Sequence, residues 1–130
     1  MHRIFLALAG FFGATGVILG SLASHLLKHQ LTLSQLATFQ IGIQYQMLHA
    51  IALLTLAIWL HYRQDKLIKI AGICFCIGIL CFSGTLYSVT CLGLTSSGTA
   101  PIGGIAFILG WTLLILVAIR HKKAISENKN

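Results

Sequence analysis

The stretch that decides the fold is residues 4–23, which read IFLALAGFFGATGVILGSLA and contain no charged side chain. Twenty residues in a helix extend about 30 Å, which is the thickness of the hydrocarbon core of a bilayer. The apolar region of a secretory signal peptide is shorter. We therefore interpret this stretch as a membrane-spanning helix that is retained in the protein.

Three further apolar segments follow the first, and together they predict an all-α membrane protein. We expect four transmembrane helices at about residues 4–23, 41–60, 67–92 and 101–119. A short interfacial helix is expected between the first two spans, because Thr32 and Gln35 have the spacing of a capping box. Residues 1–130 then form one transmembrane domain, a four-helix bundle that ends in a cytoplasmic basic tail at 120–130.

The composition supports a membrane protein and excludes a soluble domain. Hydrophobic residues make up 57% of the chain and charged residues 8%, whereas soluble domains carry about 25% charged residues. So few polar groups cannot cover a core in water, but a lipid bilayer accepts an apolar surface. The net charge is +7. The basic residues lie at the ends of the apolar segments, so we expect no nucleic-acid partner.

The distribution of the basic residues predicts the orientation of the chain. Four spans place both termini and the turn at 61–66 on one side of the membrane. Of the nine Lys and Arg residues, all except Lys28 fall on that side. Positive charges gather on the cytoplasmic side of membrane proteins, so we expect both termini in the cytoplasm.

Four glycines mark one face of the first span. Gly10, Gly13, Gly16 and Gly20 recur at intervals of three and four residues, which places them on one side of a helix. Small residues at this spacing let another helix approach closely, so we expect a helix-packing face. A ligand groove along the same glycines is the alternative.

Polar side chains inside the spans are the candidate functional residues. His49 lies about 12 Å into the second span at 1.5 Å per residue, and ionisable groups at such depth usually face the bundle interior and have partners. We predict that Ser83 or Tyr87 of the third span forms a hydrogen bond with His49. The full candidate pocket comprises His25, Gln44, Tyr45, Gln46, His49, Ser83 and Tyr87.

Two interpretations of these polar residues are open. They form either a hydrogen-bond network that fixes helix packing, or an outward-facing polar pocket with His49 at its floor. The predicted spans contain no acid, because Asp65 and Glu127 fall in cytoplasmic segments. Catalysis by paired carboxylates or by a Ser-His-Asp triad therefore lacks its acid, and we expect no enzyme.

Neither the cysteines nor the histidines indicate a metal site or a cofactor. Three of the four cysteines lie within one apolar run, without the spacing of a zinc site, and are interpreted as small hydrophobic residues. His25 and His29 are four residues apart and share a helix face if that segment is helical. No third ligand is placed beside them. We expect no bound metal.

Several motifs together resemble one known family. They are Gly20-Ser-Leu-Ala-Ser-His25, Phe39 through Gly42, Gln44-Tyr-Gln-Met47 with His49-Ala50, Phe82-Ser-Gly-Thr-Leu-Tyr87, and Pro101-Ile-Gly-Gly104 with Gly110-Trp111. Over nearly the whole chain, the sequence is similar to the domain-of-unknown-function 423 family of small bacterial inner-membrane proteins. The resemblance implies four helices and the bacterial inner membrane, and it implies no activity. The chain departs from the family pattern at 21–26, where the family is richer in Gly and Ala.

Two functions follow as expectations from these observations. The first is a non-enzymatic helix bundle that acts through association with itself, as a homo-oligomer, or with a membrane-protein partner. It rests on the glycine face and on the lack of a catalytic set. The alternative is a carrier or channel for a small neutral or anionic solute, which uses the outward-facing polar pocket around His49.

Overall fold

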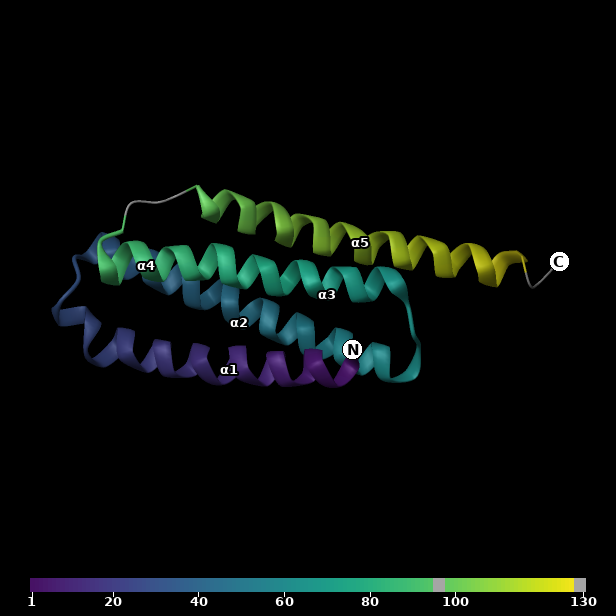
Figure 1. The fold of residues 1–130 in the computed structure, drawn as a ribbon, viewed down its shortest axis with the longest axis horizontal. Coiled ribbons are helices and arrows are strands. Elements are labelled where there is room, and N and C mark those ends of the chain that lie inside the picture. Colours follow the sequence, from purple (N-terminus) through teal and green to yellow (C-terminus); the bar gives the residue numbers. More distant parts are fainter. Residues whose placement is uncertain (95–97, 128–130) are drawn as a thin grey trace.

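The computed structural model describes residues 1–94 and 98–127, with side chains described up to residue 120. This part of the chain is built from helices and contains no strand (Figure 1). The elements are α1 (His2–His25), η1 (Leu27–His29), α2 (Leu33–Tyr62), α3 (Lys66–Gly78), η2 (Ile79–Ser83), α4 (Gly84–Leu92) and α5 (Thr99–Glu127). The elements α3, η2 and α4 follow one another directly and form one continuous rod.

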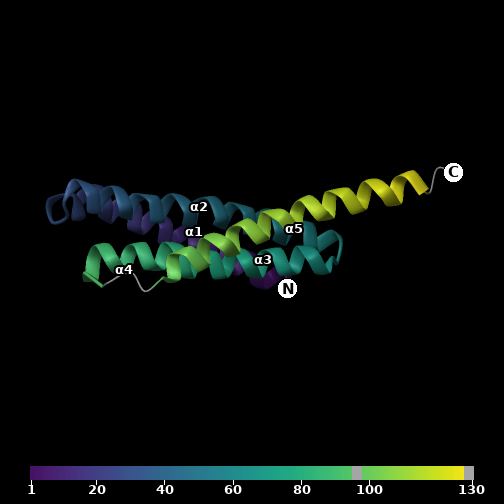
Figure 2. The same ribbon diagram turned by 90° about the horizontal axis from the view of Figure 1, so that it is seen from above.

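Four helical rods are long and apolar enough to cross a membrane, as the sequence predicts. Within the described residues these rods are His2–His29, Leu33–Tyr62, Lys66–Leu92 and Thr99–Arg120. They run along one common long axis (Figures 1 and 2). Helices suit this role because their backbone hydrogen bonds close within each rod and need no water.

The ends of the rods divide the molecule into two ends. The start of α1, the end of α5 and the turn between α2 and α3 lie at one end, which we call the basic end (Figure 1). The connection through η1, the end of α4 and the start of α5 lie toward the opposite end (Figure 1). Arg3, Arg63 and Lys66 are all near the basic end, whereas Lys28 of η1 is at the opposite end. Four spans therefore separate the charges as the sequence predicts.

The connection between the first two spans differs from the expectation. The predicted capping box is present, because the Thr32 side chain accepts from the backbone N–H of Gln35 and the Gln35 side chain accepts from the backbone N–H of Thr32. The helix that begins there continues without a break to Tyr62. The separate interfacial helix is therefore not confirmed. Residues 33–41 contain neither Gly nor Pro, so nothing in the sequence interrupts the helix.

Aromatic rings and glycines form the closest contacts of the core. The Phe5 ring of α1 lies against Gly72 of α3, at the place that a Cβ atom would occupy. In the same way, the Phe75 ring of α3 lies against Gly110 of α5. Leu53 of α2 is fully buried between the other rods. Each of these glycines lets a neighbouring ring reach the helix backbone, which sets the spacing of the bundle.

The four glycines on α1 differ in their surroundings. At Gly16, the Met47 sulfur of α2 lies 2.5 Å from the position that a Cβ atom would occupy, so this glycine is in close contact with another helix. At Gly10, Gly13 and Gly20, nothing lies within 4 Å of that position. Within one chain, only Gly16 makes the predicted close helix contact, whereas the other three glycines line hollows between α1 and α2.

Candidate functional site

Gln46 connects three helices inside the bundle. Its side chain is only 4% exposed. The amide nitrogen donates to the backbone carbonyl of Phe12 at 2.8 Å and to the hydroxyl of Thr15 at 2.9 Å, both on α1. The amide oxygen accepts from the Tyr87 hydroxyl of α4 at 2.9 Å. Both amide hydrogens are used, so the group is satisfied without water.

His49 lies one turn further along α2 and forms a second connection. Its side chain is 2% exposed, so it faces the interior as predicted. Nδ1 lies 2.8 Å from the backbone carbonyl oxygen of Tyr45, and Nε2 accepts from the indole N–H of Trp111 on α5 at 3.2 Å. These contacts fit a neutral imidazole with its hydrogen on Nδ1, because Nδ1 then donates and Nε2 accepts.

The predicted partners of His49, Ser83 and Tyr87, are wrong. The Tyr87 hydroxyl donates to Gln46 instead. Ser83 closes the single turn of π-helix, η2, and its buried hydroxyl oxygen has no hydrogen-bond partner among the described residues. The actual partner is Trp111, which belongs to one of the family motifs. The sequence indicates such a role, because Trp111 lies far from either end of the fourth span, where an indole N–H needs a hydrogen-bond acceptor.

Aromatic rings surround the imidazole of His49. The Phe107 ring of α5 stacks on it, with 3.6 Å between the ring centroids and 14° between the planes. The Phe75 ring of α3 lies at 5.2 Å and the Trp111 ring at 6.0 Å. The hollows between α4 and α5 and between α1 and α2 are lined by residues other than His49. His49 is therefore held in a packed aromatic environment that favours its neutral form.

Of the remaining predicted residues, Tyr45 takes part through its backbone carbonyl, and the side chains of His25 and Gln44 lie outside these two connections. His25 is exposed at the last turn of α1. Tyr45 is 41% exposed, and its ring contacts Phe82 at 4.6 Å. Gln44 is also exposed, beside a hollow of about 360 Å³ between α1 and α2 that Gly20 and Gln40 help to line. The structure thus joins Gln46 to Tyr87, joins His49 to Trp111, and leaves His25 and Gln44 apart.

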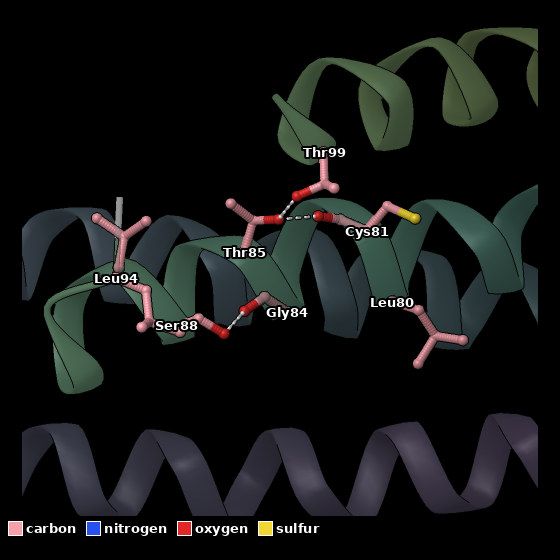
Figure 3. Close-up of a pocket in the computed structure, with 8 residues that line it drawn as sticks. Leu80, Cys81, Gly84, Thr85, Ser88, Leu94 and Thr99 are labelled. Carbon is pink, nitrogen blue, oxygen red and sulfur yellow. Dashed lines mark hydrogen bonds between the residues drawn. The ribbon is translucent and has the colours of Figure 1, made fainter. Parts of the chain in front are cut away.

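A hollow of about 530 Å³ lies where α4 faces the start of α5, toward the end opposite the basic end (Figure 3). Thr85 and Ser88 of α4 and Thr99 of α5 contribute hydroxyls to its lining. Thr85 donates to the Cys81 carbonyl and also shares a hydrogen bond with Thr99, while Ser88 donates to the Gly84 carbonyl. The lining contains no charged residue. The sequence did not predict this hollow.

Metal chemistry has no site in the described part of the chain. No group of three or more His, Cys, Asp or Glu residues lies close enough there to hold an ion. The cysteines are free, with Cys74, Cys76 and Cys81 partly buried and Cys91 exposed.

Comparison with known proteins agrees with this architecture. The UPF0382 inner membrane protein YgdD of Escherichia coli (strain K12) is 32% identical over 124 residues, which cover 92% of this chain and 90% of that protein. A UPF0382 membrane protein of Haemophilus influenzae is 38% identical over 120 residues, covering 89% of this chain and 91% of that protein. YwdK, a UPF0382 membrane protein of Bacillus subtilis, is 32% identical over 126 residues, which cover 92% of this chain and 98% of that protein.

No solved structure matches the chain. The family described as "Protein of unknown function (DUF423)" matches residues 19–104, which include Gln46, His49 and Tyr87 but not Trp111. Its relatives carry the names of membrane proteins, and four apolar helices are present here. This chain therefore belongs to the DUF423 family and is a membrane protein of four spanning helices.

Proposed function

We propose that this protein is a non-enzymatic membrane bundle that acts through association with itself or with another membrane protein. The observation that carries the proposal is the side chain of Gln44. It is exposed on α2, and it has no hydrogen-bond partner among the described residues. Gln46, two residues later, has every amide hydrogen paired. The Gln46 amide is thus paired within the chain, whereas the Gln44 amide is available to pair with a neighbouring molecule.

The depth of Gln44 makes an unpaired amide costly. The residue lies about 17 Å along α2 from Leu33, at 1.5 Å per residue. The helix has 30 residues and so extends about 45 Å, which exceeds a hydrocarbon core of about 30 Å. With the span at residues 41–60, Gln44 lies about 5 Å inside the hydrocarbon. An unsatisfied polar group there costs several kcal/mol.

A second copy of the chain supplies the missing partner. An amide carries both a donor and an acceptor, so two Gln44 side chains satisfy each other across a two-fold axis. Gly20 lies beside the same hollow, and the space at its Cβ position is open. Small residues beside a polar side chain are typical of helix contacts in membranes. An amide or hydroxyl on a different membrane protein meets the same requirement.

The absence of an enzymatic role is part of the same proposal. The buried polar atoms of Gln46 and His49 are occupied by helix-to-helix contacts. The only acids in the sequence are Asp65 and Glu127, and the Asp65 carboxylate accepts from the backbone N–H groups at the start of α3. We place the bundle in the bacterial inner membrane with both termini in the cytoplasm, because eight of nine basic residues fall near that end.

The proposal is tested by the mass of the purified protein in lipid nanodiscs. We expect the wild type to have the mass of an oligomer or of a complex with another membrane protein. We expect the Gln44→Leu variant to have the mass of a monomer and to remain folded. The matched control is Thr112→Leu on α5, which removes an exposed hydroxyl already bonded to the Ile108 carbonyl. A wild type that is monomeric and without a partner contradicts the proposal, as does an equal effect of both substitutions.

A carrier for a small solute is the second candidate, and it rests on the hollow lined by Thr85, Ser88 and Thr99. Thr85 and Ser88 donate their hydrogens to backbone carbonyls, so they offer lone pairs and favour a neutral solute over an anion. The pocket around His49 receives no support from the aromatic packing there. Proteoliposomes test this candidate: transport of a small polyol that Thr85→Val abolishes supports it, and equal leakage with and without protein counts against it.

A further inference from the structure

A groove runs between α1 and α2 from the basic end toward the middle of the bundle. It consists of two hollows, of about 190 Å³ and about 230 Å³, and Leu6 lines both. His2 and His61 line the groove at the basic end. Gly10, Gly13 and further apolar side chains line it toward the middle. Two of the three open glycines of α1, Gly10 and Gly13, thus line a defined surface feature.

The length of the groove corresponds to one leaflet of a bilayer. From His2 to Gly13 it follows eleven residues of α1, or about 17 Å at 1.5 Å per residue. Half of a hydrocarbon core of about 30 Å is about 15 Å. At its inner limit, the Met47 sulfur occupies the notch at Gly16 and closes the groove. A partner helix crosses both leaflets, whereas one acyl chain occupies one leaflet.

The basic end of the groove suits an anionic head group. The His2 and His61 rings meet edge to face, with 5.3 Å between their centroids. Arg3 follows His2 directly in the chain, and Arg63 follows at the end of α2. The acid of the turn between α2 and α3, Asp65, accepts from backbone N–H groups at the start of α3. Imidazole and guanidinium donors form strong, charge-assisted hydrogen bonds with phosphate oxygens.

We propose that this groove binds one anionic phospholipid. One acyl chain lies along Leu6 and over Gly10 and Gly13, and the lipid phosphate lies at His2 and His61. The side chains at both ends define the occupant, because Met47 limits the chain to one leaflet and the imidazoles, together with Arg3 and Arg63, favour a head group of net negative charge. The site is distinct from Gln44, which lies beyond Met47 on the half of α2 nearer the opposite end, so it does not depend on the proposed association.

The experiment uses the full chain, stripped of lipid in detergent, and counts bound lipids by native mass spectrometry. The two probes are dioleoylphosphatidylglycerol and dioleoylphosphatidylcholine, which share their chains and differ in head-group charge. We expect one phosphatidylglycerol per chain, bound about tenfold more tightly than phosphatidylcholine. The double variant His2→Ala, His61→Ala is expected to bind phosphatidylglycerol more weakly, and the further change Arg3→Gln is expected to remove the remaining preference over phosphatidylcholine.

A groove-filling variant tests the acyl-chain site separately. At Gly13, a Cβ atom meets nothing within 4 Å, so Gly13→Leu is expected to fold while its side chain fills the groove and abolishes binding of both lipids. Gly104→Leu is the matched control, because this glycine of α5 is equally open and lies outside the groove. Its lipid count is expected to equal that of the wild type. Thermal unfolding of each variant verifies that it is folded.

Four results overturn the lipid site. The first is equal affinity of the wild type for both lipids, and the second is unchanged phosphatidylglycerol binding by Gly13→Leu. The third is full competition by inorganic phosphate alone at the same concentration. The fourth is a change of oligomeric mass, rather than of lipid count, in Gly13→Leu. The last result identifies the groove as a helix contact. The Gln44→Leu variant, measured in parallel, is expected to keep its lipid, so failure of the association proposal is seen independently.

Discussion

Trp111 on α5 donates its indole N–H to Nε2 of His49 on α2, across 3.2 Å. This contact fixes the tautomer of a buried imidazole, because the other nitrogen, Nδ1, faces the Tyr45 carbonyl. It also connects the second and fourth spans at a depth where no water competes. The two side chains therefore give the packing of α5 against α2 a polar contact in addition to its ring contacts.

Replacing Trp111 by Phe is expected to lower the free energy of unfolding by about 1 kcal/mol, the typical loss for one hydrogen bond, with measured membrane cases often smaller. The ring remains and the donor is lost, so Nε2 of His49 becomes a buried acceptor without a partner. Unfolding of the detergent-solubilised protein in SDS measures the difference. In a double-mutant cycle with His49→Gln, the two changes are expected to be non-additive. Full additivity shows that the contact contributes nothing.

Gln46 and Gln44 form a matched pair for the next prediction. Gln46→Leu is expected to destabilise the monomer by about 1–3 kcal/mol, because it leaves the Tyr87 and Thr15 hydroxyls in the interior without their shared partner. Gln44→Leu is expected to leave monomer stability unchanged, since its amide has no partner within the described chain. The same SDS titration compares both variants. A larger loss for Gln44→Leu reverses the assignment of the two glutamines.

Much of the fold could be predicted from the sequence, because a bilayer imposes strong constraints on it. Apolar segments as long as residues 4–23 must be helices in lipid, and the capping box at Thr32 identifies where α2 begins. The interfacial helix was not predictable in this way. Its polar composition suggested a separate element, but a sequence without Gly or Pro between 33 and 41 allows one continuous helix.

The candidate site was predicted only in part, for a physical reason. Depth and polarity indicate that His49 and Gln46 must find partners, but they do not indicate which helix supplies them. That choice depends on how the rods rotate against each other, and the rotation is set by ring-to-glycine contacts such as Phe75 against Gly110. Periodicity on one helix does not reveal these contacts. Hence Trp111 was missed, and Ser83 was wrongly chosen.

Gly16 and Gly13 test the contact between α1 and α2. Gly16→Leu is expected to destabilise the protein by about 1–3 kcal/mol through overpacking, because the Met47 sulfur lies 2.5 Å from the Cβ position. Gly13→Leu adds the same side chain at an open position and is expected to be neutral or slightly stabilising, since Leu favours the helix more than Gly. Thermal unfolding separates the two. Equal tolerance at both positions contradicts the close contact at Gly16.

The orientation can be tested with a cysteine that the chain already contains. Cys91 is exposed near the end of α4, at the end opposite the basic end. If both termini are cytoplasmic, a membrane-impermeant maleimide added to spheroplasts, whose inner membrane is intact, labels Cys91, and Cys91→Ala removes the label. In that Cys91→Ala background, Gln64→Cys in the turn between α2 and α3 is expected to react only after the membrane is permeabilised. Labelling of Gln64→Cys in intact spheroplasts, together with protection of Cys91, reverses the orientation. The basic residues near the termini would then face the periplasm, against the usual distribution of positive charge.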